Sequence, residues 1–288
     1  MSKLKKALRI KIISIGNSEA GKSCIIKRYC EKRFVPKYLQ TIGIDYGVTK
    51  VTLKERELKV NIFDMSGHVV FHEVRNEFYK DTQGAILVFD VNDRGSFESL
   101  EGWINEMKQD LEAMKSKSFD NIVFVVCANK IDKGLVHFIL ALNLIWFLMI
   151  LYKSIGQRAV DELEARMWAS NKGMHYFETS ASSGSGVSEM FELLLAEIVT
   201  AFENGGKPLP VNSNLGVTKE LYEAIQRLNN SKDNYEKLGL KMGCTKDEVN
   251  NSFRRLAKLL HPDKNMYPGS GDAFKLLMTA KTELLRNF

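Results

Sequence analysis

Gly16-Asn17-Ser18-Glu19-Ala20-Gly21-Lys22-Ser23 is the stretch that decides the fold, because it fits the pattern G-x-x-x-x-G-K-[ST]. An apolar, β-branched run at residues 9–15 precedes it and predicts a buried strand, and a helical pattern follows it. Glycines in such a loop let backbone N–H groups and a helix N-terminus face negative oxygens. The Lys22 ammonium would reach the β- and γ-phosphates, and the Ser23 hydroxyl would ligate Mg²⁺. The stretch therefore predicts a phosphate-binding loop for a nucleotide.

Strand-like and helix-like segments alternate beyond this loop. Apolar runs lie at residues 60–63, 85–89, 122–128 and 175–179, and helical segments such as 97–114 lie between most of them. This alternation predicts βαβ units and a mostly parallel sheet with helices on both faces. With 288 residues, the chain has room for one full α/β domain and a small appendage.

The composition is that of an ordinary globular protein, with 44% hydrophobic and 26% charged residues. The formal net charge of +6 is modest, and the basic residues are spread along the chain. Small basic clusters near the start and around Arg254 are typical of solvated protein faces. We therefore expect no nucleic-acid binding.

The four cysteines, Cys24, Cys30, Cys127 and Cys244, lack C-x-x-C spacing, and the first three fall in apparent core elements. This pattern predicts reduced, buried thiols in a cytosolic protein. The N-terminus has no apolar signal, Ser2 stands where myristoylation needs glycine, and no cysteine lies near the C-terminal end. We expect no lipid anchor and a cytoplasmic location, with the nucleus as a second compartment.

Two motifs point to guanine as the base. Asn129-Lys130-Ile131-Asp132 ends one apolar run, and Thr179-Ser180-Ala181 ends the next. They resemble the N-K-x-D and S-A elements of Ras-like GTPases. The resemblance implies that Asp132 accepts hydrogen bonds from the guanine N1–H and amine, which adenine cannot offer. It also implies that Lys130 and Phe34 sandwich the base, and that the Ala181 N–H meets the guanine carbonyl.

Two further segments lie in the right order for switch regions. Tyr38-Leu39-Gln40-Thr41-Ile42-Gly43-Ile44-Asp45 resembles the first switch of Rab proteins, and Asp64-Met65-Ser66-Gly67 resembles the D-x-x-G of the second. The resemblance makes Thr41 a second Mg²⁺ ligand that senses the γ-phosphate, and makes Asp64 hold the metal through water. The Gly67 N–H would touch the γ-phosphate. The same resemblance implies a P-loop GTPase fold with a doubly wound, six-stranded, mostly parallel sheet.

The candidate site follows from these motifs. The predicted nucleotide-binding residues are Gly16, Asn17, Ser18, Glu19, Ala20, Gly21, Lys22, Ser23, Cys24, Phe34, Thr41, Gly67, Asn129, Lys130, Asp132, Ser180 and Ala181. The predicted metal ligands are Ser23, Thr41 and Asp64, and the predicted catalytic residues are His68, Thr41 and Lys22. The cofactors are GTP or GDP and Mg²⁺.

His68 departs from the family, which mostly has a glutamine at this position to orient the attacking water. An imidazole has a different shape and donor pattern, and substitutions here accompany slow hydrolysis in the family. We therefore expect a weak GTPase that favours the GTP state unless an activating partner intervenes.

An apolar insertion at residues 134–155 is the second departure. It adds about twenty residues to the family pattern, and its apolar core at 135–152 reaches about 18 residues, near the lower limit for crossing a bilayer. Three interpretations stay open: a membrane segment, a helix packed on the domain or a partner, and a product of alternative splicing. The splicing interpretation is favoured, because membrane contact would press the base-binding edge against lipid.

The C-terminal segment carries a second strong pattern. Thr245-Lys246-Asp247-Glu248 is a capping box that opens a helix, and His261-Pro262-Asp263 separates this helix from another. One face of the first helix is apolar, and the other carries Arg254 and Lys258. With Tyr235-Glu236-Lys237-Leu238-Gly239 upstream, the segment resembles the all-α J domain of DnaJ-type co-chaperones. The resemblance assigns chaperone binding to His261, Pro262, Asp263, Arg254 and Lys258.

The predicted organisation is a GTPase domain at 1–203, a linker with a short helix at 204–232 and a J domain at 233–288. We expect a GTP-dependent switch that binds an effector through its switch loops and a heat-shock ATPase chaperone through its J domain. The alternative is a scaffold with a permanently bound nucleotide. A membrane-anchored adaptor built on residues 135–152 is the less favoured third hypothesis.

Overall fold

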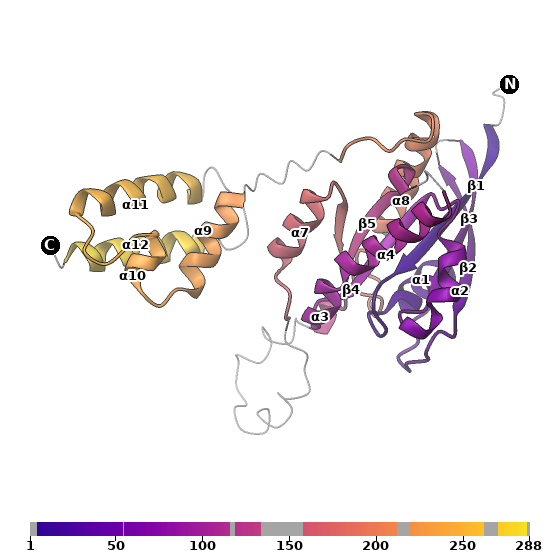
Figure 1. The fold of residues 1–288 in the computed structure, drawn as a ribbon, viewed down its shortest axis with the longest axis horizontal. Coiled ribbons are helices and arrows are strands. Elements are labelled where there is room, and N and C mark those ends of the chain that lie inside the picture. Colours follow the sequence, from indigo (N-terminus) through magenta and orange to yellow (C-terminus); the bar gives the residue numbers. More distant parts are fainter. Residues whose placement is uncertain are drawn as a thin grey trace. The chain divides into compact units, whose positions relative to one another are not determined.

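The computed structural model of the chain describes residues 5–53, 55–115, 119–133, 158–211, 219–261 and 270–286. It divides into two compact units, Met1–Asn212 and Ser213–Phe288 (Figure 1). The predicted insertion at 134–155 lies outside the described residues, as do Pro262 and Asp263. Among the helices that are described, none combines the length and the apolar character needed to span a bilayer.

The first unit is built on a six-stranded sheet with the order β2-β3-β1-β4-β5-β6. The strands are β1 (Lys5–Ile15), β2 (Ile44–Leu53), β3 (Arg56–Met65), β4 (Gly84–Asp90), β5 (Val123–Asn129) and β6 (His175–Glu178). Only the β2–β3 pair is antiparallel, while the other four neighbouring pairs are parallel. The predicted mostly parallel, six-stranded sheet is confirmed.

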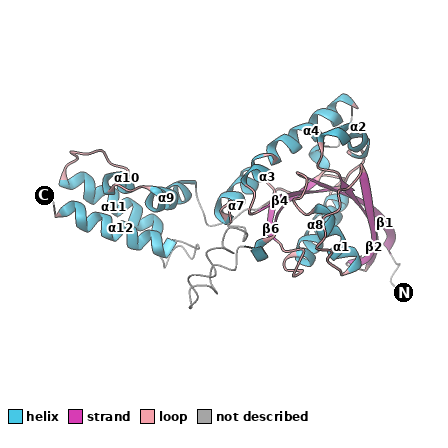
Figure 2. Ribbon diagram, turned by 90° about the horizontal axis from the view of Figure 1, so that it is seen from below, coloured by secondary structure: helices cyan, strands magenta, loops and turns pink. Residues whose placement is uncertain are grey.

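Helices cover both faces of the sheet (Figure 2). The helices are α1 (Lys22–Glu31), α2 (His72–Arg75), α3 (Arg94–Glu98), α4 (Leu100–Ala113), α7 (Glu162–Asn171) and α8 (Val187–Glu203). The 3₁₀ turns are η1 (Val69–Phe71), η2 (Asn76–Phe78), η3 (Phe119–Asn121) and η4 (Ile131–Lys133). One buried cluster joins Ile10 and Ile12 to α1 and α8, and another joins Ile13 and Ile15 to α4 and α7. Successive strand residues therefore fill opposite cores, which is why these strands read as continuous apolar runs.

Three local details differ from the sequence expectation. The expected helix at 97–114 begins at Arg94, behind an Asp93 cap, and is divided at Ser99 into α3 and α4. The edge strand β2 was not predicted, because its half-exposed pattern contains no apolar run. Cys24 and Cys30 are only partly buried, unlike Cys127. Both lie on α1, where Cys24 borders a cavity described below and Cys30 lies beside Gly47 of the edge strand β2.

The second unit is entirely helical where it is described. Its helices are α9 (Lys219–Asn230), α10 (Asn234–Leu238), α11 (Lys246–Leu260) and α12 (Ser270–Leu285). The predicted capping box is present, with the Thr245 hydroxyl accepting the Glu248 N–H and the Glu248 carboxylate accepting the Thr245 N–H. Val249, Leu256 and Leu260 are buried on α11, as the apolar face predicted.

Helix α9 packs against the other three helices of this unit. Its apolar face, Leu221, Ala224, Ile225 and Leu228, is almost fully buried. The Arg227 side chain donates to the Lys237 carbonyl at 3.4 Å. The helix that the sequence placed in a linker thus belongs to the packed C-terminal unit.

Candidate functional site

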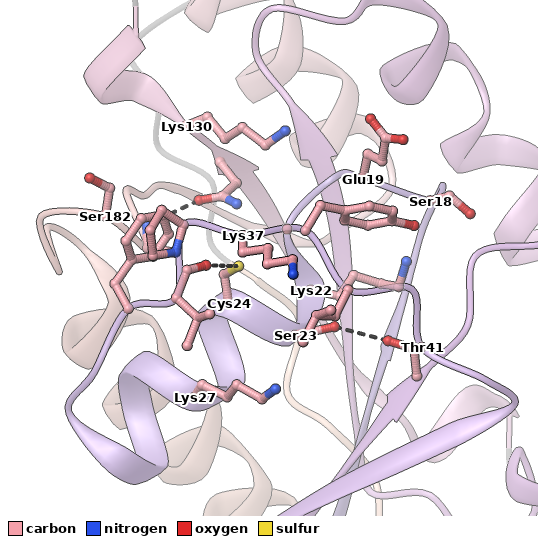
Figure 3. Close-up of a pocket in the computed structure, with 18 of the residues that line it drawn as sticks. Ser18, Glu19, Lys22, Ser23, Cys24, Lys27, Lys37, Thr41, Lys130 and Ser182 are labelled. Carbon is pink, nitrogen blue, oxygen red and sulfur yellow. Dashed lines mark hydrogen bonds between the residues drawn. The ribbon is translucent and has the colours of Figure 1, made fainter.

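A cavity of about 490 Å³ lies at the carboxyl ends of the parallel strands (Figure 3). Residues from all the predicted nucleotide motifs line it: Ser18, Glu19, Gly21, Lys22, Ser23, Cys24, Phe34, Thr41, Gly67, Asn129, Lys130, Asp132 and Ala181. Ligands of open α/β sheets bind at this edge. The motifs, spread over more than half of the chain, therefore meet in one place.

The phosphate loop needs its glycines for close contact. A Cβ on Gly16 would lie 2.2 Å from the Val88 carbonyl oxygen, and one on Gly21 would lie 2.3 Å from Nδ2 of Asn129. Gly21 and Glu19 also have left-handed backbones, with φ of 96° and 64°. The loop is thus wrapped tightly enough to bring backbone N–H groups together at one concave surface.

Lys22 lies inside this loop and is 6% exposed. Its ammonium donates to the carbonyls of Gly16 and Asn17, both at 2.8 Å. Burial lowers the pKa of Lys22 to about 8, and the nearby Asp64 opposes this shift. Burial destabilises the charged form of Lys22, and a nearby anion stabilises it, so this ammonium favours an anionic phosphate as its partner.

The three predicted metal ligands meet at Thr41. Its hydroxyl is 3.0 Å from the Ser23 hydroxyl and donates to Oδ2 of Asp64 at 3.2 Å. Ser14 donates to the other carboxylate oxygen at 3.3 Å. Burial raises the pKa of Asp64, while hydrogen bonds from Ser23 and Thr41 oppose the rise. Two hydroxyls and one buried carboxylate beside the phosphate loop fit Mg²⁺, which prefers oxygen ligands and shares them with phosphates.

Asn129 organises the end of the cavity at which the sequence predicts base binding. Its side chain donates to the Ala20 carbonyl at 2.9 Å, and its oxygen accepts from the Thr179 hydroxyl and the Ala181 N–H, both at 3.3 Å. Ser180 donates to Oδ1 of Asp132 at 2.7 Å. Ser180 and Ala20 themselves lie outside the cavity lining and act through these contacts.

Arg28 supports the cavity through hydrogen bonds that the sequence did not predict. Its Nε donates to the Ala181 carbonyl at 2.8 Å, and its Nη2 donates to the Ser182 carbonyl at 2.5 Å. Arg28 lies on α1, which begins at the phosphate loop. The loop at residues 181–182, where the sequence predicts base binding, is therefore tied to the helix that follows the predicted phosphate loop.

The first switch covers the other side of the cavity. Besides Phe34 and Thr41, the lining includes four residues of the switch motifs that were not chosen as site residues: Tyr38, Leu39, Gln40 and Ser66. It also includes residues that lie outside every motif: Lys27, Val35, Pro36, Lys37, Lys133 and Ser182. Phe34 is 36% exposed at this edge. Motif matching finds residues of fixed type and spacing, and the lining residues outside the motifs follow no such pattern.

His68 is outside the cavity lining, although Gly67 is in it. The Nδ1 atom of His68 accepts the Val70 N–H at 3.3 Å and so caps a 3₁₀ turn. A Cβ on Gly67 would lie 2.3 Å from the Ser18 nitrogen, so the second switch touches the phosphate loop here. In this arrangement the imidazole of His68 serves the backbone of the second switch.

Arg75, the last residue of α2, connects the segment after the second switch to α4. Its guanidinium forms two 2.7 Å bonds with the Glu106 carboxylate on α4 and donates to the His68 carbonyl at 2.8 Å. It lies 4.7 Å from the centre of the Trp103 ring. Trp103 donates in turn to Oδ1 of Asn17 at 2.8 Å. Asn17 thus supports the cavity indirectly, as a link between α4 and the phosphate loop.

In the second unit, Arg254 and Lys258 are exposed on α11, and His261 caps its C-terminal end. The His261 ring lies 6.0 Å from the Phe274 ring in an edge-on arrangement. The structure thus places three of the five predicted chaperone-binding residues on or at the end of one helix.

Comparison with known proteins matches both units. A model of the Ras family matches residues 11–200, and a model of the DnaJ domain matches residues 233–287. The chain is 58% identical to "DnaJ homolog subfamily C member 27-A" of Xenopus laevis over 284 residues, which are 98% of this chain and 95% of that protein. It is 56% identical to the Gallus gallus protein and 55% identical to the Homo sapiens protein named "DnaJ homolog subfamily C member 27", with the same coverage.

Proposed function

Because the chain belongs to the Ras family of GTPases and carries a C-terminal DnaJ domain, we propose that it is a guanine-nucleotide switch that recruits a heat-shock ATPase chaperone. GTP and GDP, with Mg²⁺, would set the conformation of the two switch segments. The switch segments would select an effector protein, and the J domain would bring the chaperone to it.

The observation that best supports a switch is the position of Thr41. This residue of the first switch contacts Ser23 of the phosphate loop and Asp64 of the second switch through one hydroxyl. When bound, Mg²⁺ would neutralise phosphate charge and take Ser23, Thr41 and the water-bridged Asp64 as neighbours. Ligand chemistry at this single point would therefore act on both switches together.

Lys22 and the loop backbone would bind and orient the phosphates, and Asp132 would select guanine. For hydrolysis, His68 stands at the position of the glutamine that orients the attacking water in the family, yet it is outside the cavity lining and caps its own turn. This supports slow hydrolysis of the bound GTP. It also gives support to the second candidate, a scaffold that keeps its nucleotide and does not cycle.

Hydrogen exchange distinguishes the switch from the scaffold. Full-length protein loaded with GDP or with a non-hydrolysable GTP analogue is compared over residues 34–45 and 64–79. A switch requires different protection in the two states, since a ligand with equal affinity for both states shifts nothing. Equal protection in both segments would favour the scaffold.

Chaperone recruitment has a separate test. The full-length chain is added to a purified heat-shock ATPase, and ATP hydrolysis is measured with His261→Gln and Met242→Ala as variants. We expect stimulation by the wild type and the M242A control, whose residue is an exposed side chain away from His261 in sequence, and none by H261Q. Equal stimulation by H261Q would contradict recruitment through this helix end.

Cell fractionation tests the cytoplasmic and nuclear location, which stays a prediction.

A further inference from the structure

Lys130 has an unusual backbone conformation at the base-binding end of the cavity. It follows β5 directly, lines the cavity and has a φ of 68°, in the left-handed region that residues with side chains seldom adopt. Such a conformation persists only where surrounding contacts determine it. The contacts of Lys130 are therefore informative about its role.

Asp90 supplies the strongest of these contacts. It is the last residue of β4 and lies beside Asn129 in the register of the sheet. Its Oδ2 atom is 2.7 Å from Nζ of Lys130, and the two side chains are only 14% and 22% exposed. This pair is more shielded from water than an ordinary surface ion pair, so its attraction is less screened.

Asn92 fixes the Asp90 carboxylate itself. Its N–H and its side-chain amide both donate to Oδ1 of Asp90 at 2.9 Å, and the amide also lies 3.4 Å from the Lys130 carbonyl. One carboxylate oxygen is thus anchored to Asn92 and the other is directed at the Lys130 ammonium. The ammonium of Lys130 is held by the last residue of β4, and its carbonyl is contacted by the turn that follows β4.

This anchoring decides where the methylene stem of Lys130 runs. A Cβ on Gly21 would lie 3.8 Å from Cε of Lys130, so the stem passes over the phosphate loop. Figure 3 shows the extended Lys130 side chain along one edge of the cavity. Asp90 does not line the cavity, so its influence on a ligand passes through Lys130.

We propose that Asp90 is a positioning residue for guanine binding, which holds the Lys130 ammonium so that the stem lies ready along the face of the base. The inference rests on the proposed nucleotide binding. A free lysine samples many rotamers, and restricting it before the ligand arrives removes an entropic cost from binding. The pairing also turns the charge away, so that the base meets methylene groups.

The first test measures release of a fluorescent GDP from the full-length chain. Asp90→Asn keeps the size and the Asn92 contact but removes the charge, and we expect release about five- to twentyfold faster. Asp90→Glu retains a carboxylate and should recover part of this loss. The matched control is Glu164→Gln, which removes the carboxylate paired with Arg94 at 2.6 Å outside the cavity. It should stay within about twofold of the wild type.

A double-mutant cycle separates positioning from general stability. Lys130→Met keeps an unbranched stem without the ammonium. If Asp90 acts through Lys130, D90N should change release by less than about twofold in the K130M background. If release from K130M is too fast to follow, equilibrium titration of the four chains gives the same coupling.

Two results would overturn the inference alone: an unchanged release rate in D90N, or equal acceleration by D90N in both backgrounds. Failure of the wild-type chain to bind any guanine nucleotide would instead reject the proposed function, and the inference with it.

Discussion

The Arg75 guanidinium and the Glu106 carboxylate form a bidentate ion pair at 2.7 Å that joins α2, which follows the second switch, to α4. Arg75 is 2% exposed, while Glu106 is 24% exposed at its side chain. Tyr79 also donates to Glu106 at 2.6 Å. The buried charge of Arg75, on a segment that is expected to move, is therefore neutralised by the carboxylate of Glu106.

Glu106→Ala should lower the free energy of unfolding of the first unit by about 2–4 kcal/mol, because Arg75 would keep a buried charge without its partner. Urea unfolding followed by tryptophan fluorescence measures this, since all three tryptophans fall within residues 1–212. Glu98→Ala removes the more exposed pair with Arg94 and should cost less than about 1 kcal/mol. Equal losses in the two variants would show that the Arg75 pair is not energetically special.

His68→Gln should increase the intrinsic GTP hydrolysis rate by at least about tenfold, because the family's glutamine orients the attacking water. His68→Ala should stay within about threefold of the wild type, since the imidazole is used as a cap and is outside the cavity lining. Single-turnover phosphate release measures both rates. A large decrease in H68A would mean that the imidazole does take part in hydrolysis.

Nucleotide affinity should fall as the pH rises above about 8. Burial lowers the pKa of Lys22 to about 8 in the free protein, and bound phosphates would raise it again, so binding above this pH takes up a proton. The affinity should then weaken by up to about tenfold per pH unit. GDP titrations between about pH 7 and about pH 9 measure this, with Lys22→Arg as the control that remains charged. An affinity with the same pH dependence in both chains would exclude Lys22 as the cause.

Leu228→Ala should destabilise the C-terminal unit by about 2–5 kcal/mol, because this α9 side chain is fully buried. Hydrogen exchange at α12 in the full-length chain measures the effect on this unit alone. Met242→Ala, at a side chain that is 84% exposed, should leave the exchange unchanged. Unchanged protection in L228A would mean that α9 contributes little to the unit.

Local chemistry explains what the sequence predicted well. The phosphate loop, the apolar strands and the Thr245 capping box each depend on residues close together in the chain, so their patterns are readable and the fold class is confirmed. Most of the motif residues also line one cavity, because parallel strands bring their carboxyl ends to one edge.

Long-range and weakly patterned features were not predictable in this way. Arg28 contacts Ala181 across 153 residues, and no spacing rule connects them. Strand β2 alternates between exposed and partly buried positions and contains no continuous apolar run, so a search for such runs missed it. The capping role of His68 depends on the turn at Val70, which only the folded backbone defines.

The packing of α9 has a practical consequence for biochemical work on the C-terminal unit. The DnaJ-domain match begins at residue 233, downstream of α9. A fragment cut there would expose the apolar side chains of α10, α11 and α12 that α9 covers with Leu221, Ile225 and Leu228. Exposed apolar surface promotes association with other proteins, so such a fragment would bind partners nonspecifically. A fragment that keeps α9 would report on recruitment alone.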